Sequence, residues 1–265
     1  MRLWRSPITG AALRPDGEHI LVAPGERWPV LDGIPYLRVG RDDLVQRTLE
    51  RLDAGNIDGA LAFLLADADE WWDEPAPPES ELRSVIADID HISLREAMRR
   101  LGFGRVGDYF AHRWSDPTFA AGRHLLEEYW LQPKSAFELA CGIGHYLRLF
   151  RDAGVPNLVG GDVVFAKLWL ARTFVCPSAD FVCFDAAAPW PLDAEFDLVL
   201  CADAFYFMPQ KSYVAERLLE TTARTLIVSH VHNSEVGNHS AGAAIDREGL
   251  AALFPSAEIF DDAEL

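Results

Sequence analysis

The segment FELACGIGH, residues 137–145, places two glycines directly after an apolar run and before a helical pattern. Gly142 and Gly144 allow the backbone to turn sharply and to approach a ligand closely, because glycine carries no side chain that would clash. The helix that follows offers unpaired N–H groups and the positive end of its dipole. Such a loop can bind a nucleotide phosphate or the carboxylate of an amino-acid group, and two glycines alone do not decide between these ligands.

Acidic residues recur at the ends of successive apolar runs. Glu138 lies at the first of these positions, Asp162 at the second and Asp185 at the third. The carboxylate of Asp162 can accept hydrogen bonds from both hydroxyls of a ribose, and that of Asp185 can accept from an adenine amino group. Each carboxylate alone would be explained as a helix cap or a solvated strand end. Three in register favour a ligand that contains adenosine.

A third group of polar residues lies in SHVHNSEVGNHSAGA, residues 229–243, which contains His230, His232 and His239. An imidazole with an ordinary pKa of about 6.5 is suited to removing a proton from an acceptor near neutral pH. The alternatives are a polar loop with hydrogen-bonded histidines and a divalent metal site. We expect a general base or a substrate-binding loop and no metal. In the aromatic run FYF, residues 205–207, we expect at least one ring to face the same cavity, and we take Tyr206, with His230 and His232, as the candidate catalytic residues.

The elements that must position these residues follow from the periodicity of residues 134–265. Short apolar runs alternate there with amphipathic segments, which is typical of a parallel sheet covered by helices. We expect strands at SAFELA, NLVGGDV, DFVCFDA, FDLVLCADA, RTLIVSHV and AEIFDD, separated by helices. The predicted fold is α/β, with a doubly wound and mostly parallel sheet, in which ligands bind beyond the carboxyl ends of the strands.

Two further regions precede this predicted sheet. Residues 41–133 have helical periodicity and predict a helical lid or substrate region. Residues 1–40 are punctuated by glycine and proline and predict a small β module. The predicted domains are therefore 1–40, 41–133 and 134–265.

Residues 137–203 resemble the core of the class I, Rossmann-like, S-adenosylmethionine-dependent methyltransferases. The usual loop of that class is an apolar pair and an acid followed by LGCGTG; FELACGIGH matches it, with Ala140 in place of the first glycine. The resemblance implies that Glu138 to Gly144 surround the methionine portion of S-adenosylmethionine, that Asp162 binds the ribose and that Asp185 lies near the adenine. The cofactor residues that it implies in the core are Glu138, Ala140, Cys141, Gly142, Gly144, Asp162, Val163, Asp185, Ala186 and Asp203.

The segment DYFAHRWSDPTF precedes the core at the position of the helical lid of many small-molecule methyltransferases. The resemblance implies that Tyr109 or Arg113 touches the cofactor carboxylate or the substrate, and that Trp114 anchors the lid. A dinucleotide site would instead need GxGxxG, and Leu147 stands at the third glycine position. Hydride transfer is therefore the weaker hypothesis.

The N-terminal segments PITGAAL and WPVLDGIPYLR are similar to a small zinc-ribbon family that activates RNA and protein methyltransferases. Cysteines bind zinc in that family, whereas the first cysteine of this chain is Cys141, so thiolate ligation is impossible in residues 1–40. The resemblance implies a module without a metal that docks through its apolar residues. It is either a built-in accessory or interaction domain or a relic that packs against the helical region.

Composition limits the partners. The formal net charge of −17 repels phosphate backbones and anionic lipids, so we expect no nucleic acid and no membrane. None of the four cysteines forms a CxxC pair, and the N-terminus lacks a signal-peptide pattern, which together favour a reduced, cytoplasmic protein.

The predicted function is O- or N-methylation of a small molecule or a peptide natural product. The alternatives are a non-catalytic scaffold or activator with the same fold, and a protein methyltransferase. A homodimer is compatible with the sequence, and nothing in it identifies the methyl acceptor.

Overall fold

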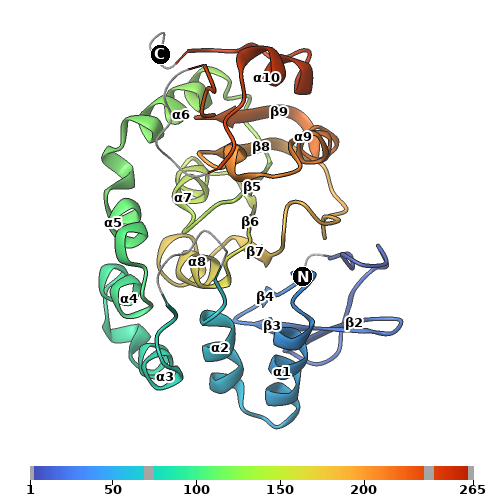
Figure 1. The fold of residues 1–265 in the computed structure, drawn as a ribbon, viewed down its shortest axis with the longest axis vertical. Helices are drawn as coiled ribbons and strands as arrows, with labels where there is room; N and C mark the ends of the chain where they lie inside the picture. Colours follow the sequence, from blue (N-terminus) through green and yellow to red (C-terminus); the bar gives the residue numbers. More distant parts are fainter. Residues whose placement is uncertain (1–2, 69–74, 236–241, 262–265) are drawn as a thin grey trace.

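The structure is a computed structural model that describes residues 3–68, 75–235 and 242–261. Its N-terminal part is a small antiparallel sheet in the strand order β1-β2-β3-β4, drawn in blue in Figure 1. The turns between these strands contain the glycines and prolines that predicted them. The strands are β1 (Arg14–Pro15), β2 (Ile20–Ala23), β3 (Glu26–Leu31) and β4 (Ile34–Pro35).

Hydrogen bonds around Glu26 hold this N-terminal module together. The Glu26 carboxylate accepts from the hydroxyls of Ser6 at 2.5 Å and Thr9 at 2.6 Å, and from the Trp28 indole at 2.9 Å. Burial raises the pKa of Glu26, but these three donors outweigh burial and hold the pKa below its ordinary value. Side-chain hydrogen bonds therefore tie the start of the chain to β3.

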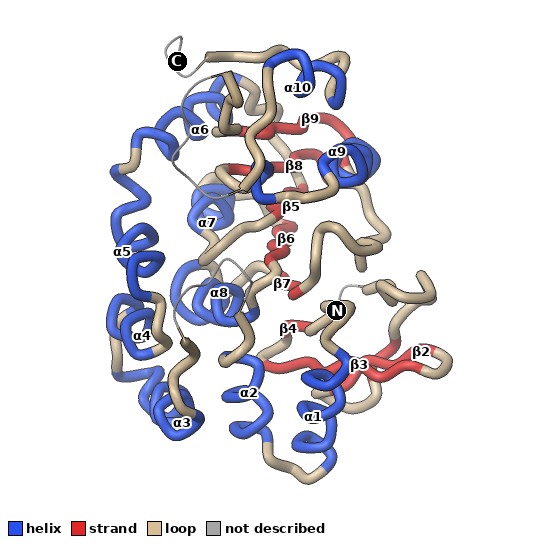
Figure 2. The backbone as a smooth tube through the Cα atoms, viewed as in Figure 1, coloured by secondary structure: helices blue, strands red, loops and turns tan. Residues whose placement is uncertain are grey.

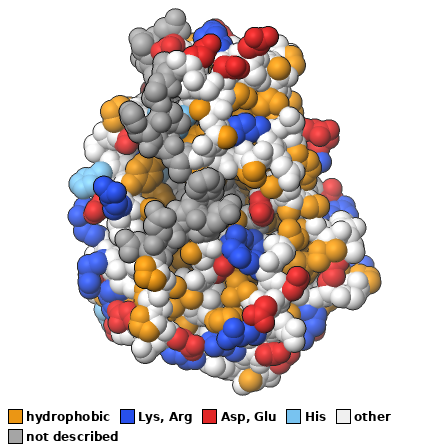
Figure 3. Space-filling view, viewed as in Figure 1, with side chains coloured by type: hydrophobic (Ala, Val, Ile, Leu, Met, Phe, Trp, Pro, Cys, Tyr) orange, Lys and Arg blue, Asp and Glu red, His pale blue; other side chains and the backbone are white. Residues whose placement is uncertain are grey.

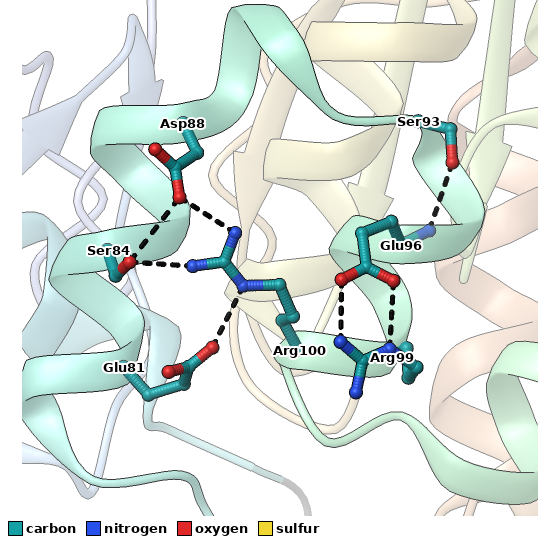
Figure 4. A network of polar contacts seen from close by, with 7 residues as sticks. All are labelled: Glu81, Ser84, Asp88, Ser93, Glu96, Arg99 and Arg100. Carbon is teal, nitrogen blue, oxygen red and sulfur yellow. Dashed lines mark hydrogen bonds and ion pairs between the residues drawn. The ribbon is translucent and has the colours of Figure 1, made fainter.

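Helices follow over the region that the periodicity marked as helical. They form a column along one side of the molecule, from α3 to α6 in Figure 1, with α1 and α2 beside the N-terminal module. Arg100 links two of them, because its guanidinium donates to Glu81, Ser84 and Asp88 of the preceding helix (Figure 4). The helices are α1 (Asp42–Asp53), α2 (Ile57–Leu65), α3 (Glu79–Asp88), α4 (Leu94–Arg100), α5 (Gly104–His112) and α6 (Pro117–Glu128).

A parallel sheet in the order β7-β6-β5-β8-β9 forms the core of the remaining chain, and five strands of it are described (Figure 2). The order reverses direction between β5 and β8, so the crossover helices cover both faces and the fold is doubly wound, as predicted. The strands are β5 (Ser135–Leu139), β6 (Asn157–Asp162), β7 (Asp180–Cys183), β8 (Phe196–Ala202) and β9 (Thr222–Ser229), and the helices between them are α7 (His145–Asp152), α8 (Phe165–Leu170) and α9 (Lys211–Glu220).

The N-terminal module docks on the outer edge of this sheet. Tyr36 forms a parallel bridge with Cys183 of β7, and the Leu37 N–H donates to the Cys183 carbonyl at 2.7 Å. On the neighbouring helix α8, the buried Trp169 donates its indole N–H to Asp32 in the turn before β4. Because an open strand edge presents unpaired backbone groups, the module both covers the edge and adds apolar contact to α8.

One segment that the sequence predicts as a strand is a loop in the structure. The prediction of a last strand at AEIFDD is wrong for residues 257–261, which form no ladder and follow helix α10 (Arg247–Leu253) as loop. The prediction relied on a short apolar run whose length does not separate a strand from a packed loop. His239, which the sequence groups with His230 and His232, lies outside the described residues.

Surface and core properties agree with a globular α/β protein. Acidic and basic side chains are interspersed over the face in Figure 3. All four cysteines are buried free thiols. Over the part of the chain that is described, no helix is long and apolar enough to cross a membrane.

Candidate functional site

A cavity of about 470 Å³ opens at the carboxyl ends of the central strands. Its floor comes from the loops after β5, β6, β7 and β8, and its cover from helix α5, which we call the lid helix. This is the position at which a doubly wound sheet binds ligands, because the strand order reverses there and leaves a crevice between adjacent loops.

The loop after β5 carries the strained backbone that the glycine pattern predicted. Ala140 and Gly142 both have φ of 54°, and Gly144 has φ of 82° at the start of α7. Alanine in this left-handed region costs about 1–3 kcal/mol, which explains why a glycine is common in its place. A Cβ added to Gly142 would lie 3.0 Å from the Phe110 ring of the lid helix, so this glycine also lets the lid approach.

Glu138 lies at the inner wall of the cavity and is buried. Burial raises its pKa well above the ordinary value, while an N–H from Leu147 and the charge of Arg113 act in the opposite direction. Its Oε2 has no hydrogen-bond partner in the protein although it is fully buried. A buried acceptor at a cavity wall is costly when unpaired, so a ligand that donates a hydrogen bond fits here.

Asp162 is the last residue of β6, and its carboxylate links the loop after β5 to the loop after β6. Its Oδ2 accepts from the Gly142 N–H and its Oδ1 from the Val164 N–H, both at 2.9 Å. The ammonium of Lys167 is 3.7 Å from Oδ1. These contacts hold the carboxylate in one orientation beside the cavity, and each oxygen keeps a second lone pair with which it can accept a ligand hydroxyl.

Asp185 and Ala186 form the far end of the cavity, after β7. Asp185 Oδ1 accepts from the Ala187 N–H at 2.8 Å, and the ring of Phe184 lines the same wall. A flat, apolar wall next to a carboxylate is suited to a purine with an exocyclic amino group.

Asp203, after β8, is the centre of a polar network at the opposite end. Its Oδ2 accepts from the Tyr109 hydroxyl at 2.6 Å and lies 3.5 Å from an Arg113 guanidinium nitrogen. Its Oδ1 accepts from the Tyr206 hydroxyl at 3.2 Å and lies 3.7 Å from His230 Nε2. Burial, and then the Asp203 charge, raise the pKa values of Tyr109 and Tyr206, so both phenols stay protonated donors.

The two histidines after β9 stand beside this network. The His232 ring stacks on Tyr206 with centroids 3.7 Å apart, and the His230 ring lies edge-on to His232. Burial, and then the neighbouring His230, lower the pKa of His232. The structure thus brings together the three side chains proposed from the sequence as catalytic, although it places both histidines behind Asp203 rather than on the cavity wall itself.

The cavity includes most of the predicted cofactor residues, with one exception. Gly144 does not line it and instead forms the turn into α7. Arg113 is buried and pairs with Asp116 as well as Asp203, and Trp114 packs edge-on against Phe119 and His145. Sequence reasoning missed several lining residues, because their sequence patterns are those of ordinary core or helix positions: Val106, Phe110, Tyr146, Lys167 and Phe184.

His145 is the most informative residue that the sequence pattern left unexplained. It begins α7, and its Nε2 lies 3.1 Å from the Phe110 carbonyl of the lid helix. Burial lowers its pKa to about 4, so the ring is neutral and donates to that carbonyl. Its role is to attach the lid helix to the cofactor loop.

Residues 137–227 match a family model described as a methyltransferase domain. None of the curated proteins compared with the chain matches it.

Solved structures with similar folds have low sequence identity. One is a chain in the complex of the Haloferax volcanii Trm112 methyltransferase activator with a second protein, at TM-score 0.49 and 19% identity, covering 62% of this chain and 75% of that chain. Another is Haemonchus contortus phosphoethanolamine N-methyltransferase 2, at TM-score 0.48 and 15% identity, covering 62% and 44%. A third is CalS10, an amino pentose methyltransferase from Micromonospora echinaspora, at TM-score 0.41 and 18% identity, covering 49% and 58%. We report these as likenesses of fold only.

Residues 137–227 therefore carry a methyltransferase domain, and the doubly wound sheet that contains them has the Rossmann-like arrangement of the class I type. The cofactor of this class is S-adenosylmethionine, and the cavity has the acidic and apolar walls that this cofactor needs.

Proposed function

We propose that the protein transfers the methyl group of S-adenosylmethionine to an oxygen or nitrogen atom of a small molecule or a peptide natural product. The observation that carries this proposal is the cavity itself, which has one end lined by acids and glycines and a second end where Tyr109 and Tyr206 meet Asp203, with His230 behind that carboxylate. We place the acceptor at this second end.

The cofactor side is assigned residue by residue. Asp162 would accept from the ribose hydroxyls and Asp185 from the adenine amino group. The unpartnered Oε2 of Glu138 would accept from the amino group of the methionine portion. When bound, S-adenosylmethionine supplies a methyl group on a positively charged sulfur.

On the acceptor side the chain must align the acceptor and exclude water. The lid helix covers the cavity, and the contacts of Tyr109 and Arg113 with Asp203 hold it closed. His230, His232 and Tyr206 would act on the acceptor, helping it to lose its proton before or during transfer. We assign these three residues as the catalytic group.

The charge and the size of the site favour a small acceptor. The chain carries 41 acidic and 24 basic residues, which disfavours a polyanionic nucleic acid. A cavity of about 470 Å³ that must also hold the cofactor favours a small acceptor, or a single exposed group of a larger one.

The test is methyl transfer from labelled S-adenosylmethionine to a panel of hydroxylated aromatics, amino sugars and short peptides. We expect turnover with one of these classes, lower by roughly 10² to 10⁴ in Tyr206→Phe or His232→Ala. The affinity for S-adenosylhomocysteine should stay unchanged in His232→Ala. Wild-type protein that binds the cofactor but leaves every acceptor unmethylated would favour a non-catalytic scaffold instead.

A further inference from the structure

Asp203 and the two histidines after β9 form a cluster with the composition of a metal site. One ligand atom from each of Asp203, His230 and His232 lies within 4.8 Å of the others. We propose that these three side chains bind a divalent transition-metal cation at the acceptor end of the cavity. The spacing of the histidines alone did not favour a metal, because Asp203 comes from another strand and only the fold brings it opposite them.

The candidate ligand atoms lie slightly farther apart than a bound cation would hold them, so small movements of the side chains would bring them into range. A tetrahedral ion with bonds of about 2.0–2.1 Å holds its ligand atoms about 3.3 Å apart. His230 Nε2 is 3.7 Å from Asp203 Oδ1, close to this spacing. The side chains are partly exposed, at 24% for His230 and 13% for Asp203, so a cation can reach them.

The backbone at this cluster is strained at two positions. Asp203 and His230 both have φ of 53°, although neither is glycine. Each residue directly follows its strand, Asp203 after β8 and His230 after β9. The Asp203 N–H donates to the Ser229 carbonyl at 3.0 Å, which joins the two strand ends. Left-handed conformations cost about 1–3 kcal/mol each and persist where the surrounding structure enforces them, commonly at functional sites.

Neighbouring side chains hold the three candidate ligands in place. Tyr206 donates to Asp203 Oδ1 and stacks on the His232 ring, so it orients two of them at once. Tyr109 and Arg113 contact the other carboxylate oxygen, Oδ2, and leave a lone pair of Oδ1 for the cation. Such outer contacts raise the affinity of a metal site by fixing the orientation of its ligands.

The donor set indicates the class of ion. Two imidazoles and one carboxylate suit Zn²⁺, Fe²⁺, Co²⁺ or Ni²⁺, whereas Mg²⁺ and Ca²⁺ prefer sites made of oxygen ligands. Three protein ligands leave coordination positions open, as in catalytic rather than structural sites.

Because Asp203 also lines the cavity, a hydroxyl of the acceptor can occupy an open position. This consequence rests on the proposed function and deepens it, since it favours an oxygen acceptor. The cation would lower the pKa of that hydroxyl, whose proton passes to solvent; the oxygen then takes the methyl group from the sulfonium, and S-adenosylhomocysteine is the leaving group.

The proposal is tested by titrating chelator-stripped, full-length protein with Co²⁺, followed by its visible absorption and by calorimetry. We expect one Co²⁺ per chain, displaced by Zn²⁺ and not by millimolar Mg²⁺. His230→Ala and His232→Ala should weaken binding by roughly 100-fold or more. His91→Ala, at an exposed position away from the site, should bind as wild type does.

S-adenosylhomocysteine binding is measured on the same samples to show that the variants are folded and to keep the two proposals apart. Co²⁺ binding without methyl transfer would leave the metal site standing and count against the proposed function. Methyl transfer at full rate in chelator-stripped protein that binds no Co²⁺ would overturn the metal site alone. Equal Co²⁺ affinity in the wild type, His230→Ala and His232→Ala would also overturn it, since binding would then lie elsewhere on the acidic surface.

Discussion

Tyr109 on the lid helix donates a hydrogen bond of 2.6 Å to Asp203 at the end of β8, across the open end of the cofactor cavity. Arg113 reaches the same carboxylate oxygen at 3.5 Å. One carboxylate therefore holds the cover of the cavity to the sheet and also lies at the proposed acceptor end, so the position of the lid and the arrangement of that end depend on the same residue.

Removing the Tyr109 hydroxyl should loosen the lid. Hydrogen bonds to charged groups contribute about 1.5–3 kcal/mol when buried, and Tyr109 is partly exposed, so we expect Tyr109→Phe to weaken S-adenosylhomocysteine binding by roughly tenfold. Calorimetry measures this affinity. Tyr213→Phe is the matched control, because its hydroxyl donates to the Ala188 carbonyl outside the cavity. Equal affinities in both variants would contradict the role of the lid contact.

Gly142→Ala should weaken cofactor binding for a steric reason. The added Cβ would lie 3.0 Å from Phe110, so the lid helix must move outward in addition to the backbone strain at φ of 54°. Gly154→Ala is a close control, because φ there is 83° and nothing lies within 4 Å of the added atom. We expect a loss of affinity of more than roughly tenfold in Gly142→Ala and little change in Gly154→Ala, whereas both should lose some stability.

His145 should make the unfolding free energy depend on pH. Its pKa is about 4 in the folded protein against 6.5 in the unfolded chain, so the unfolded state binds more protons between these values. The unfolding free energy should therefore fall as pH drops from about 6.5 to about 4. Urea denaturation of wild type and His145→Asn at pH 7 and pH 5 checks this. The variant should lose less stability between the two pH values; an identical loss in both proteins would contradict the assignment.

Docking of the N-terminal module on α8 should contribute to stability. Asp32→Ala leaves the buried Trp169 indole N–H without its acceptor, which costs about 1–3 kcal/mol of unfolding free energy. Asp193→Ala removes an exposed carboxylate that pairs with Arg5 and should cost well under about 1 kcal/mol. Chemical denaturation compares the two. A loss in Asp32→Ala no larger than that in Asp193→Ala would mean that this contact does not anchor the module.

The order of strands and helices in the sheet follows from the sequence because parallel strands bury both faces and appear as short apolar runs. That Gly142, Asp162 and Asp185 line one cavity was predictable for a similar reason, since each lies at the end of such a run. The structure of the last segment does not follow in this way, because an apolar run of a few residues such as AEIFDD suits a packed loop equally well.

The acceptor end depends on contacts between distant segments, and local pattern does not reveal these. Tyr109 and Asp203 are 94 residues apart, and only the path of the chain from α5 back to β8 makes them neighbours. His145 is another example. It lies at the end of the segment FELACGIGH, but its partner, the Phe110 carbonyl, is 35 residues earlier in the chain and is visible only in three dimensions.

The central claim is that the cavity binds S-adenosylmethionine through the carboxylate that ends β6. Isothermal titration of the wild type and Asp162→Ala with S-adenosylhomocysteine tests it most directly, with circular dichroism to confirm that the variant is folded. We expect the wild type to bind with one site per chain and the folded Asp162→Ala variant to show no measurable binding. Wild-type affinity in that variant would contradict the ribose assignment, and a wild type that binds neither S-adenosylmethionine nor S-adenosylhomocysteine would contradict the account as a whole.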